Sequence, residues 1–163
     1  MKVDFWQLGH DPAERVVALI ARRIRDEGGR LLVVNADTAA LDNISKALWT
    51  IFPDAFLAHG LSGQGNEARQ PVLLSSGIDR ENQATNIILA DGQWRKEALA
   101  FERSFLLFDD DTLQAARAAW AGLKTSRQER SPDSGQDHDP DLANLALSYF
   151  AQENGRWVQK AQG

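Results

Sequence analysis

The segment TLQAARAAWAGL carries the residues best suited to recognition chemistry in this 163-residue chain. Leu113, Arg117 and Trp120 stand at i, i+4 and i+7, so they line one face of a predicted helix. Small alanines surround Arg117 and leave this face uncrowded. A guanidinium beside an indole suits a ligand that carries both a carboxylate and an apolar group. The same spacing also fits a core-facing stripe in which Leu113 and Trp120 are buried and Arg117 extends to solvent.

A second candidate is the glycine-rich run GLSGQG at residues 60–65. A P-loop needs a lysine directly after its second glycine, followed by Ser or Thr for magnesium. Gly65 is followed instead by Asn66 and Glu67, whose carboxylate repels phosphate. A flexible loop is therefore the favoured interpretation. The alternative is an α/β nucleotide- or phosphate-binding enzyme that uses the 60–65 loop as an anion cradle and His59 as a general base.

Other catalytic and metal-binding constellations are sparse. The chain has no cysteine and three histidines far apart, which excludes disulfides and thiol chemistry. The acidic run Asp109–Asp111 could bind magnesium, but its position before a helix favours a capping role. Ser62 does not lie in a G-x-S-x-G elbow. We expect no catalytic residue, no bound metal and no cofactor.

The elements that position these residues alternate between strands and helices. Short apolar runs predict strands, and apolar residues at helical spacing between them predict helices. The strand runs are residues 3–8, 31–34, 71–74, 86–90 and 105–108, and the helical segments are 12–27, 38–51, 94–101 and 112–123. This alternation predicts a three-layer α/β domain over residues 1–123 with a mainly parallel sheet.

The C-terminal part of the chain differs in composition. Residues 124–140 contain no large aliphatic or aromatic residue and are predicted to form a flexible linker. Beyond them, Leu142, Leu145 and Tyr149 recur at i, i+3 and i+7, which predicts a helical appendage over residues 141–163. A short extended piece, GRWVQ, is expected at its end.

Charge and hydropathy limit the classes of partner. The formal net charge is −5, and residues 1–124 carry 14 basic against 17 acidic side chains. Strong binding to nucleic acid usually needs a basic excess, so direct binding of this kind is not expected. No apolar run has the length of a signal peptide or a membrane span. We therefore expect a cytoplasmic protein with no membrane partner.

Several segments resemble the chi subunit family of bacterial DNA polymerase III holoenzyme. They are Leu41–Asp42, Ala47–Trp49, Phe56 and His59–Leu61, with FWQL near the start and FLLFDDDTLQAARAAW late in the chain. The resemblance covers roughly residues 3–123. It implies a mononucleotide-binding-like fold without a P-loop, and a non-catalytic accessory role in DNA replication.

The resemblance also implies partners and a site. The chi subunit links the clamp-loader complex, often through a small psi subunit, to single-stranded DNA-binding protein, whose acidic, Phe-ending C-terminal tail it holds. By this likeness the tail site comprises Trp49, Leu106, Arg117 and Trp120. Leu113 stands where relatives can carry a lysine, which reduces the cationic contribution. No residue is assigned to the clamp-loader contact.

Overall fold

One sheet of eight strands organises the computed structural model, which describes residues 1–129 and 142–163. The strand order is β3-β4-β2-β5-β6-β1-β7-β8, and every neighbouring pair is parallel except β7 with β8. The strands are β1 (Lys2–Gln7), β2 (Leu31–Val34), β3 (His59–Leu61), β4 (Val72–Ser75), β5 (Asn86–Leu89), β6 (Arg103–Phe108), β7 (Ala146–Glu153) and β8 (Arg156–Gln162). The helices are α1 (Ala13–Asp26), α2 (Thr38–Thr50) and α3 (Leu113–Gln128), with 3₁₀ turns η1 (Pro53–Ala55), η2 (Glu67–Arg69), η3 (Lys96–Ala100) and η4 (Leu142–Asn144).

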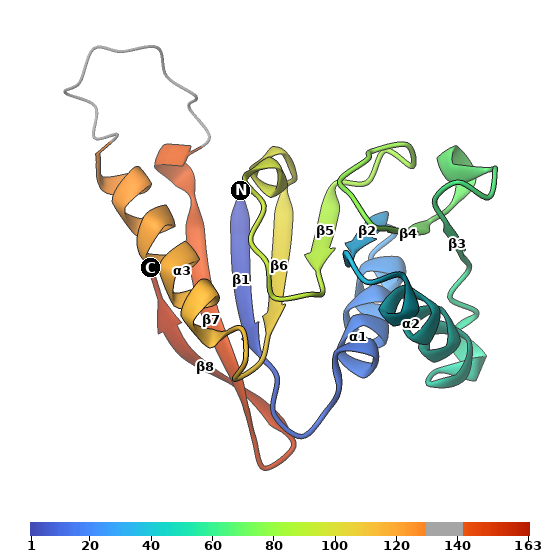
Figure 1. Ribbon diagram of the computed structural model, residues 1–163, viewed down its shortest axis with the longest axis horizontal. Coiled ribbons are helices and arrows are strands. Elements are labelled where there is room, and N and C mark those ends of the chain that lie inside the picture. Colours follow the sequence, from blue (N-terminus) through green and yellow to red (C-terminus); the bar gives the residue numbers. More distant parts are fainter. Residues whose placement is uncertain (130–141) are drawn as a thin grey trace.

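The helices cover both faces of this sheet. In Figure 1, α1 and α2 lie together toward the β3 end, and α3 lies toward the β7–β8 end. The core is accordingly divided into two clusters, one packed under α1 and α2 and the other under α3. Strand β2 has all four residues buried because both of its faces are covered. The predicted three-layer α/β fold with a mainly parallel sheet is confirmed.

Connection handedness explains which face each helix covers. The chain moves from β1 through α1 to β2 and through α2 to β3, in one direction across the sheet. It then moves from β6 through α3 to β7, in the opposite direction. Crossovers between parallel strands are right-handed in nearly all proteins. A reversal of direction therefore places α3 on the face opposite α1 and α2.

The predicted C-terminal helix was wrong, whereas the expected extended piece GRWVQ does lie at the start of strand β8. Residues 146–162 form the hairpin β7–β8 and not a helix, and β7 pairs in parallel with the whole of β1. This pairing makes the segment part of the main sheet. Helix α3 also continues to Gln128, so the first residues of the predicted linker at 124–140 are helical. The rest of that linker, from residue 130, lies outside the described residues.

Alternation along β7 supplies the physical reason. Tyr149 faces the α3 side and Phe150 the other, each beside an aromatic residue of β1 or its neighbours. The sequence of this segment fits both a strand, with side chains alternating between two faces, and a helix, through the spacing of Leu142, Leu145 and Tyr149. Pairing with β1 stabilises the strand. Gln152 further fastens the hairpin to the start of α1, because its amide nitrogen donates to the Asp11 carboxylate at 2.8 Å.

Candidate functional site

A cavity of about 320 Å³ lies between α3 and the sheet. Strands β1, β6, β7 and β8 contribute its floor and walls. It is lined by Phe5, Phe108, Leu113, Ala116, Arg117, Trp120, Tyr149 and Ala161. Its volume is at the lower end for ligand pockets, which span roughly 300–1,000 Å³. The α3 cavity therefore suits a single large apolar side chain.

Aromatic packing gives this cavity a defined shape. The Trp120 ring meets the edge of Phe5, with centroids 5.1 Å apart and an interplanar angle of 80°. The Tyr149 ring stacks on Phe108 with centroids 6.0 Å apart, and its centroid lies 6.5 Å from that of Trp120. The Tyr149 hydroxyl donates to the side-chain oxygen of Gln7, which fixes the ring in place. Rigid aromatic walls can bind an apolar group without ordering many side chains.

Helix α3 presents one charged group to this cavity. Ala116 and Leu123 are buried against the sheet, Leu113 and Trp120 are half-buried, and Arg117 is exposed. Both sequence interpretations are thus partly realised: the two apolar residues join the edge of the core, and they also line the cavity. Within the described part of the chain, Arg117 forms no ion pair. Its guanidinium is therefore free to bind a carboxylate.

Leu106 does not line the cavity surface. It lies in β6 with 0% of its surface exposed, inside the core cluster under α3. The expectation that it contacts a partner is wrong, because strand β6 is covered on both faces. Leu106 instead supports the cavity floor beside Phe5, its register partner in β1.

Trp49 lies away from this cavity. It belongs to α2, which covers the face of the sheet opposite α3. The expectation of a single site with Arg117 between two indoles is therefore wrong. The handedness of the crossovers separates the two helices, and neighbouring motif positions in sequence do not reveal that separation.

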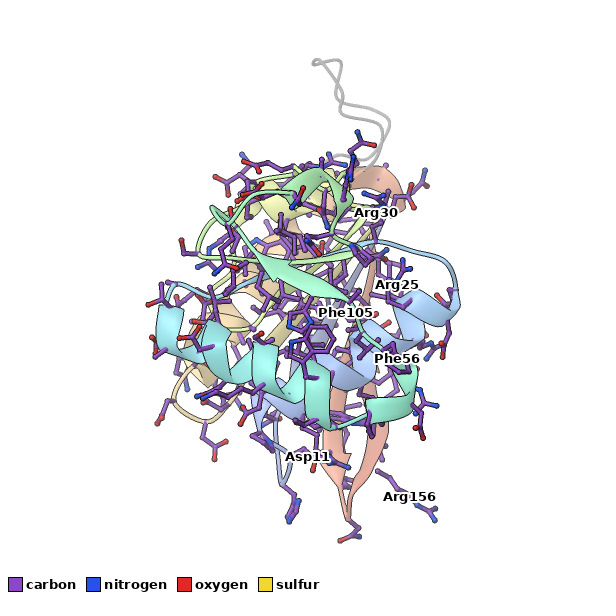
Figure 2. The ribbon with its side chains drawn as sticks, turned by 90° about the vertical axis from the view of Figure 1, so that its right-hand side faces the viewer. Asp11, Arg25, Arg30, Phe56, Phe105 and Arg156 are labelled. Atoms are coloured by element: carbon purple, nitrogen blue, oxygen red, sulfur yellow. The ribbon has the colours of Figure 1, made fainter. Side chains whose placement is uncertain are left out.

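Trp49, in the last turn of α2, and Phe56, just beyond η1, are both exposed, and together we call them the Trp49–Phe56 patch. The Trp49 side chain is 54% exposed and the Phe56 side chain is 82% exposed. Phe56 follows η1, beyond the C-terminal end of α2 (Figure 2), with a left-handed φ of 45°. Such a conformation is costly for a residue with a side chain of this size, and strain of this kind concentrates at functional sites.

The strand residues that line the α3 cavity were not predicted from the sequence. Phe5 and Phe108 are apolar strand residues, and nothing local distinguishes them from ordinary core positions. Tyr149 lies on β7, which was predicted to be helical, and Ala161 lies on β8, beyond the predicted extended piece GRWVQ. One pattern could have predicted a strand here: Leu147, Tyr149 and Ala151 recur at every second position and share one face of β7.

His59 is committed to a structural role. Its Nδ1 donates to the Leu57 carbonyl at 2.7 Å, so its Nε2 accepts the Ser45 hydroxyl hydrogen, also at 2.7 Å. Burial lowers the pKa of His59, outweighing the Leu57 hydrogen bond that raises it. The neutral ring links β3 to α2 through these hydrogen bonds, and its centroid lies 4.6 Å from the centroid of the Trp49 ring. Both ring nitrogens are occupied, which argues against the general-base role of the alternative hypothesis.

The backbone amides of the 60–65 loop already bind a carboxylate of the same chain. The Glu67 carboxylate accepts from the backbone amides of Gly63 at 2.8 Å and Gly65 at 3.1 Å. Hydrogen bonds from its own amide, Gly65 and Gly63 lower the pKa of Glu67. An anion would have to displace this carboxylate. The loop therefore gives no support to phosphate binding.

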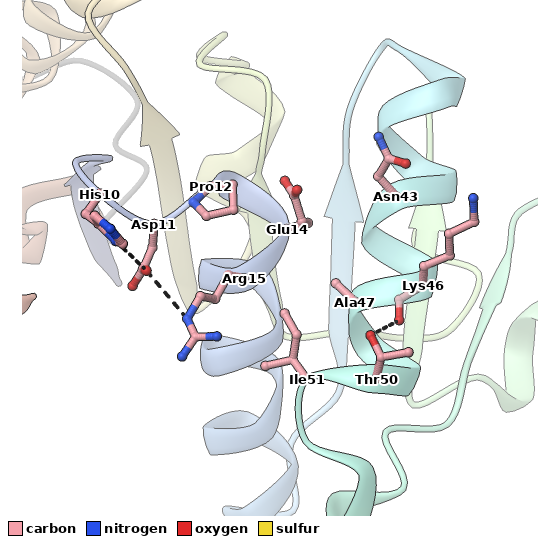
Figure 3. Close-up of a pocket in the computed structure, with 10 residues that line it drawn as sticks. All are labelled: His10, Asp11, Pro12, Glu14, Arg15, Asn43, Lys46, Ala47, Thr50 and Ile51. Atoms are coloured by element: carbon pink, nitrogen blue, oxygen red, sulfur yellow. Dashed lines mark hydrogen bonds and ion pairs between the residues drawn. The ribbon is translucent and has the colours of Figure 1, made fainter.

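A larger hollow of about 740 Å³ lies between the start of α1 and α2 (Figure 3). It is lined by residues of both charges, and the Arg15 Nε lies 3.5 Å from the Asp11 carboxylate. Hydrogen bonding to Gln152 is the main cause that lowers the pKa of Asp11. Because its charges are mixed and partly paired, this hollow selects no class of ligand.

The described residues also lack a metal-binding cluster and a membrane-spanning helix. Residues 1–129 and 142–163 contain no group of three or more His, Asp or Glu side chains placed to hold a metal ion. Asp109, considered above as a magnesium ligand, accepts hydrogen bonds from the Thr112 amide and hydroxyl at 3.0 Å each, before α3 begins. None of the helices in this part combines the length and apolar character that a bilayer crossing requires.

Comparison with known families decides the identity. The model of the family described as DNA polymerase III chi subunit, HolC, matches residues 1–129. The chain belongs to this chi family. None of the curated proteins matches it closely enough to be compared. Membership indicates an accessory subunit of DNA polymerase III and a role in replication. The matched residues include β1, β6 and all of α3, whereas the β7–β8 hairpin lies beyond them.

Proposed function

We propose that this chi-family chain is a non-catalytic adaptor that links the clamp-loader complex to single-stranded DNA-binding protein. It holds the acidic C-terminal tail of that protein in the α3 cavity. The supporting observation is the Arg117 guanidinium, which forms no ion pair with any described residue and lies at the rim of an aromatic cavity sized for one side chain. Arg117 binds the terminal carboxylate, and the aromatic walls take up the terminal Phe ring.

An adaptor needs a second surface, and the Trp49–Phe56 patch supplies one. The patch lies on the face of the sheet opposite the α3 cavity. Exposed aromatic residues of this size are typical anchors of protein interfaces. We assign the patch to the clamp-loader side, reached directly or through a psi subunit. Two partners can then bind at once without competing.

The test is a binding titration with a labelled peptide that carries the acidic, Phe-ending tail. A matched peptide lacks only the terminal Phe. We expect micromolar binding of the full peptide and at least tenfold weaker binding of the shortened one, because the cavity and Arg117 both lose their ligand groups. Equal affinity for the two peptides would reject the proposal. A pull-down of full-length single-stranded DNA-binding protein, with and without its last residues, checks the result on the native partner.

A further inference from the structure

Charge is distributed unevenly along α3. The helix carries no acidic residue between Leu113 and Gln128, and its cations are Arg117, Lys124 and Arg127. Three consecutive carboxylates, Asp109–Asp111, precede its N-cap residue Thr112. Phe108, directly before this acidic run, and Leu113, two positions after it, both line the α3 cavity. These exposed carboxylates therefore lie close in sequence to the end of the cavity where α3 begins.

Lys124 marks the other end. It follows Arg117 by seven residues, so it lies on the same face of α3, about 10 Å further along the axis. Its side chain is exposed and forms no ion pair within residues 1–129 and 142–163. Arg127 is different, because its Nη1 donates to the Leu145 carbonyl at 3.0 Å. Lys124 is thus the cation that can turn toward a bound peptide.

Local bonding does not remove the negative charge near Leu113. Asp109 is engaged by Thr112, and the helix N-terminus offsets part of its charge. Asp110 and Asp111 remain exposed. Leu113 itself offers an acidic peptide only apolar contact. An acidic segment that ran past Leu113 would meet like charges, whereas one that ran past Trp120 would meet Lys124.

We propose that the acidic residues of the tail lie along the C-terminal half of α3, toward Lys124 and away from Asp109–Asp111. This inference rests on the proposed function, and it assigns Lys124 as a residue that determines specificity. An extended peptide advances about 3.3 Å per residue. With the terminal carboxylate on Arg117, the side chain about three positions upstream therefore reaches Lys124.

The experiment compares two peptides on four proteins. One peptide is acidic and ends in Phe; the other also ends in Phe, but its upstream acidic residues are replaced by their amides. The proteins are wild type, Lys124→Ala, Asp110→Asn and Lys46→Ala, a control whose exposed lysine lies on α2. We expect Lys124→Ala to weaken the acidic peptide roughly two- to fivefold, as for an exposed ion pair. Asp110→Asn should strengthen it, and Lys46→Ala should leave it unchanged.

The amide peptide separates this inference from the proposed function. It should bind all four proteins with nearly equal affinity, because neither charge has a partner on it. Arg117→Ala is tested beside these four proteins. If it weakens binding of the acidic peptide roughly 10- to 30-fold while Lys124→Ala binds that peptide like wild type, the orientation is wrong and the tail site stands. If wild type binds neither peptide, the proposed function itself fails. A loss with Lys124→Ala that is equal for both peptides contradicts the charge assignment.

Discussion

Replacing Arg117 by Ala removes the one charged side chain that, among residues 1–129 and 142–163, lines the α3 cavity. The guanidinium is exposed in the free chain, and an exposed ion pair contributes only about 0.2–1 kcal/mol. A bound Phe ring and Trp120 would partly exclude water from it, and hydrogen bonds to charged groups contribute about 1.5–3 kcal/mol. Between these limits we expect a loss of about 1.5–2 kcal/mol. The Kd should therefore rise roughly 10- to 30-fold.

The assay is fluorescence anisotropy with the acidic, Phe-ending peptide at fixed ionic strength. Arg69→Ala is the matched control, because Arg69 is exposed on η2 and lies outside the cavity. Arg117→Lys should recover only part of the affinity, since lysine cannot form a bidentate pair with a carboxylate. Circular dichroism checks that the fold is retained. An Arg117→Ala protein that binds the peptide like wild type would refute the site.

Three further outcomes follow from the structure. The double variant Trp49→Ala, Phe56→Ala should weaken capture of the clamp-loader complex at least tenfold and leave tail binding unchanged, because both side chains are exposed and lie apart from the α3 cavity. Loss of both clamp-loader capture and tail binding would contradict two separate surfaces. Tyr149→Phe should lower the free energy of unfolding by about 0.5–1.5 kcal/mol in urea titrations, because its hydroxyl bond to β1 is lost; no change would show that this bond contributes nothing. Burial opposes ionisation of Asp91, but hydrogen bonds from Arg95 and two backbone amides outweigh it and lower the pKa below its usual 3.8. This carboxylate therefore stabilises the fold above about pH 3.8 and loses that contribution as the pH falls through its folded pKa, so Asp91→Asn should flatten the acid limb of a stability–pH curve; an identical limb would contradict this.

The sheet could be predicted because its central strands carry a local signal. The run LLVV at residues 31–34 is apolar throughout, and the structure buries all four residues between two helical layers. The 3.6-residue period of α1 likewise identifies a helix with one buried face. These patterns depend only on residues close in sequence. They therefore hold whatever the rest of the chain does.

The β7–β8 hairpin could not be predicted in the same way. Its position depends on pairing with β1, whose residues lie more than 140 positions earlier in the chain. Leu142 and Leu145 are buried around the turn η4, so their helical spacing reflects a local turn before the strand. Pairing between distant strands leaves little trace in a local window.

The candidate site was predicted in part for related reasons. Leu113, Arg117 and Trp120 share a helix face, and helical geometry alone brings them to one cavity. Trp49 was placed with them through family likeness, yet it lies across the sheet. Its position depends on the direction in which the chain crosses the sheet. Strand order sets that direction, and the residues around Trp49 do not encode it.

The most direct measurement follows the indole N–H signals of the protein by NMR while the acidic, Phe-ending peptide is added. The chain has five tryptophans, of which Trp120 lines the α3 cavity and Trp49 lies in the opposite patch. Trp120→Phe and Trp49→Phe variants assign the two signals. We expect the Trp120 signal to shift saturably and the Trp49 signal to stay in place. A shift of Trp49 with Trp120 unmoved would contradict tail binding in the α3 cavity.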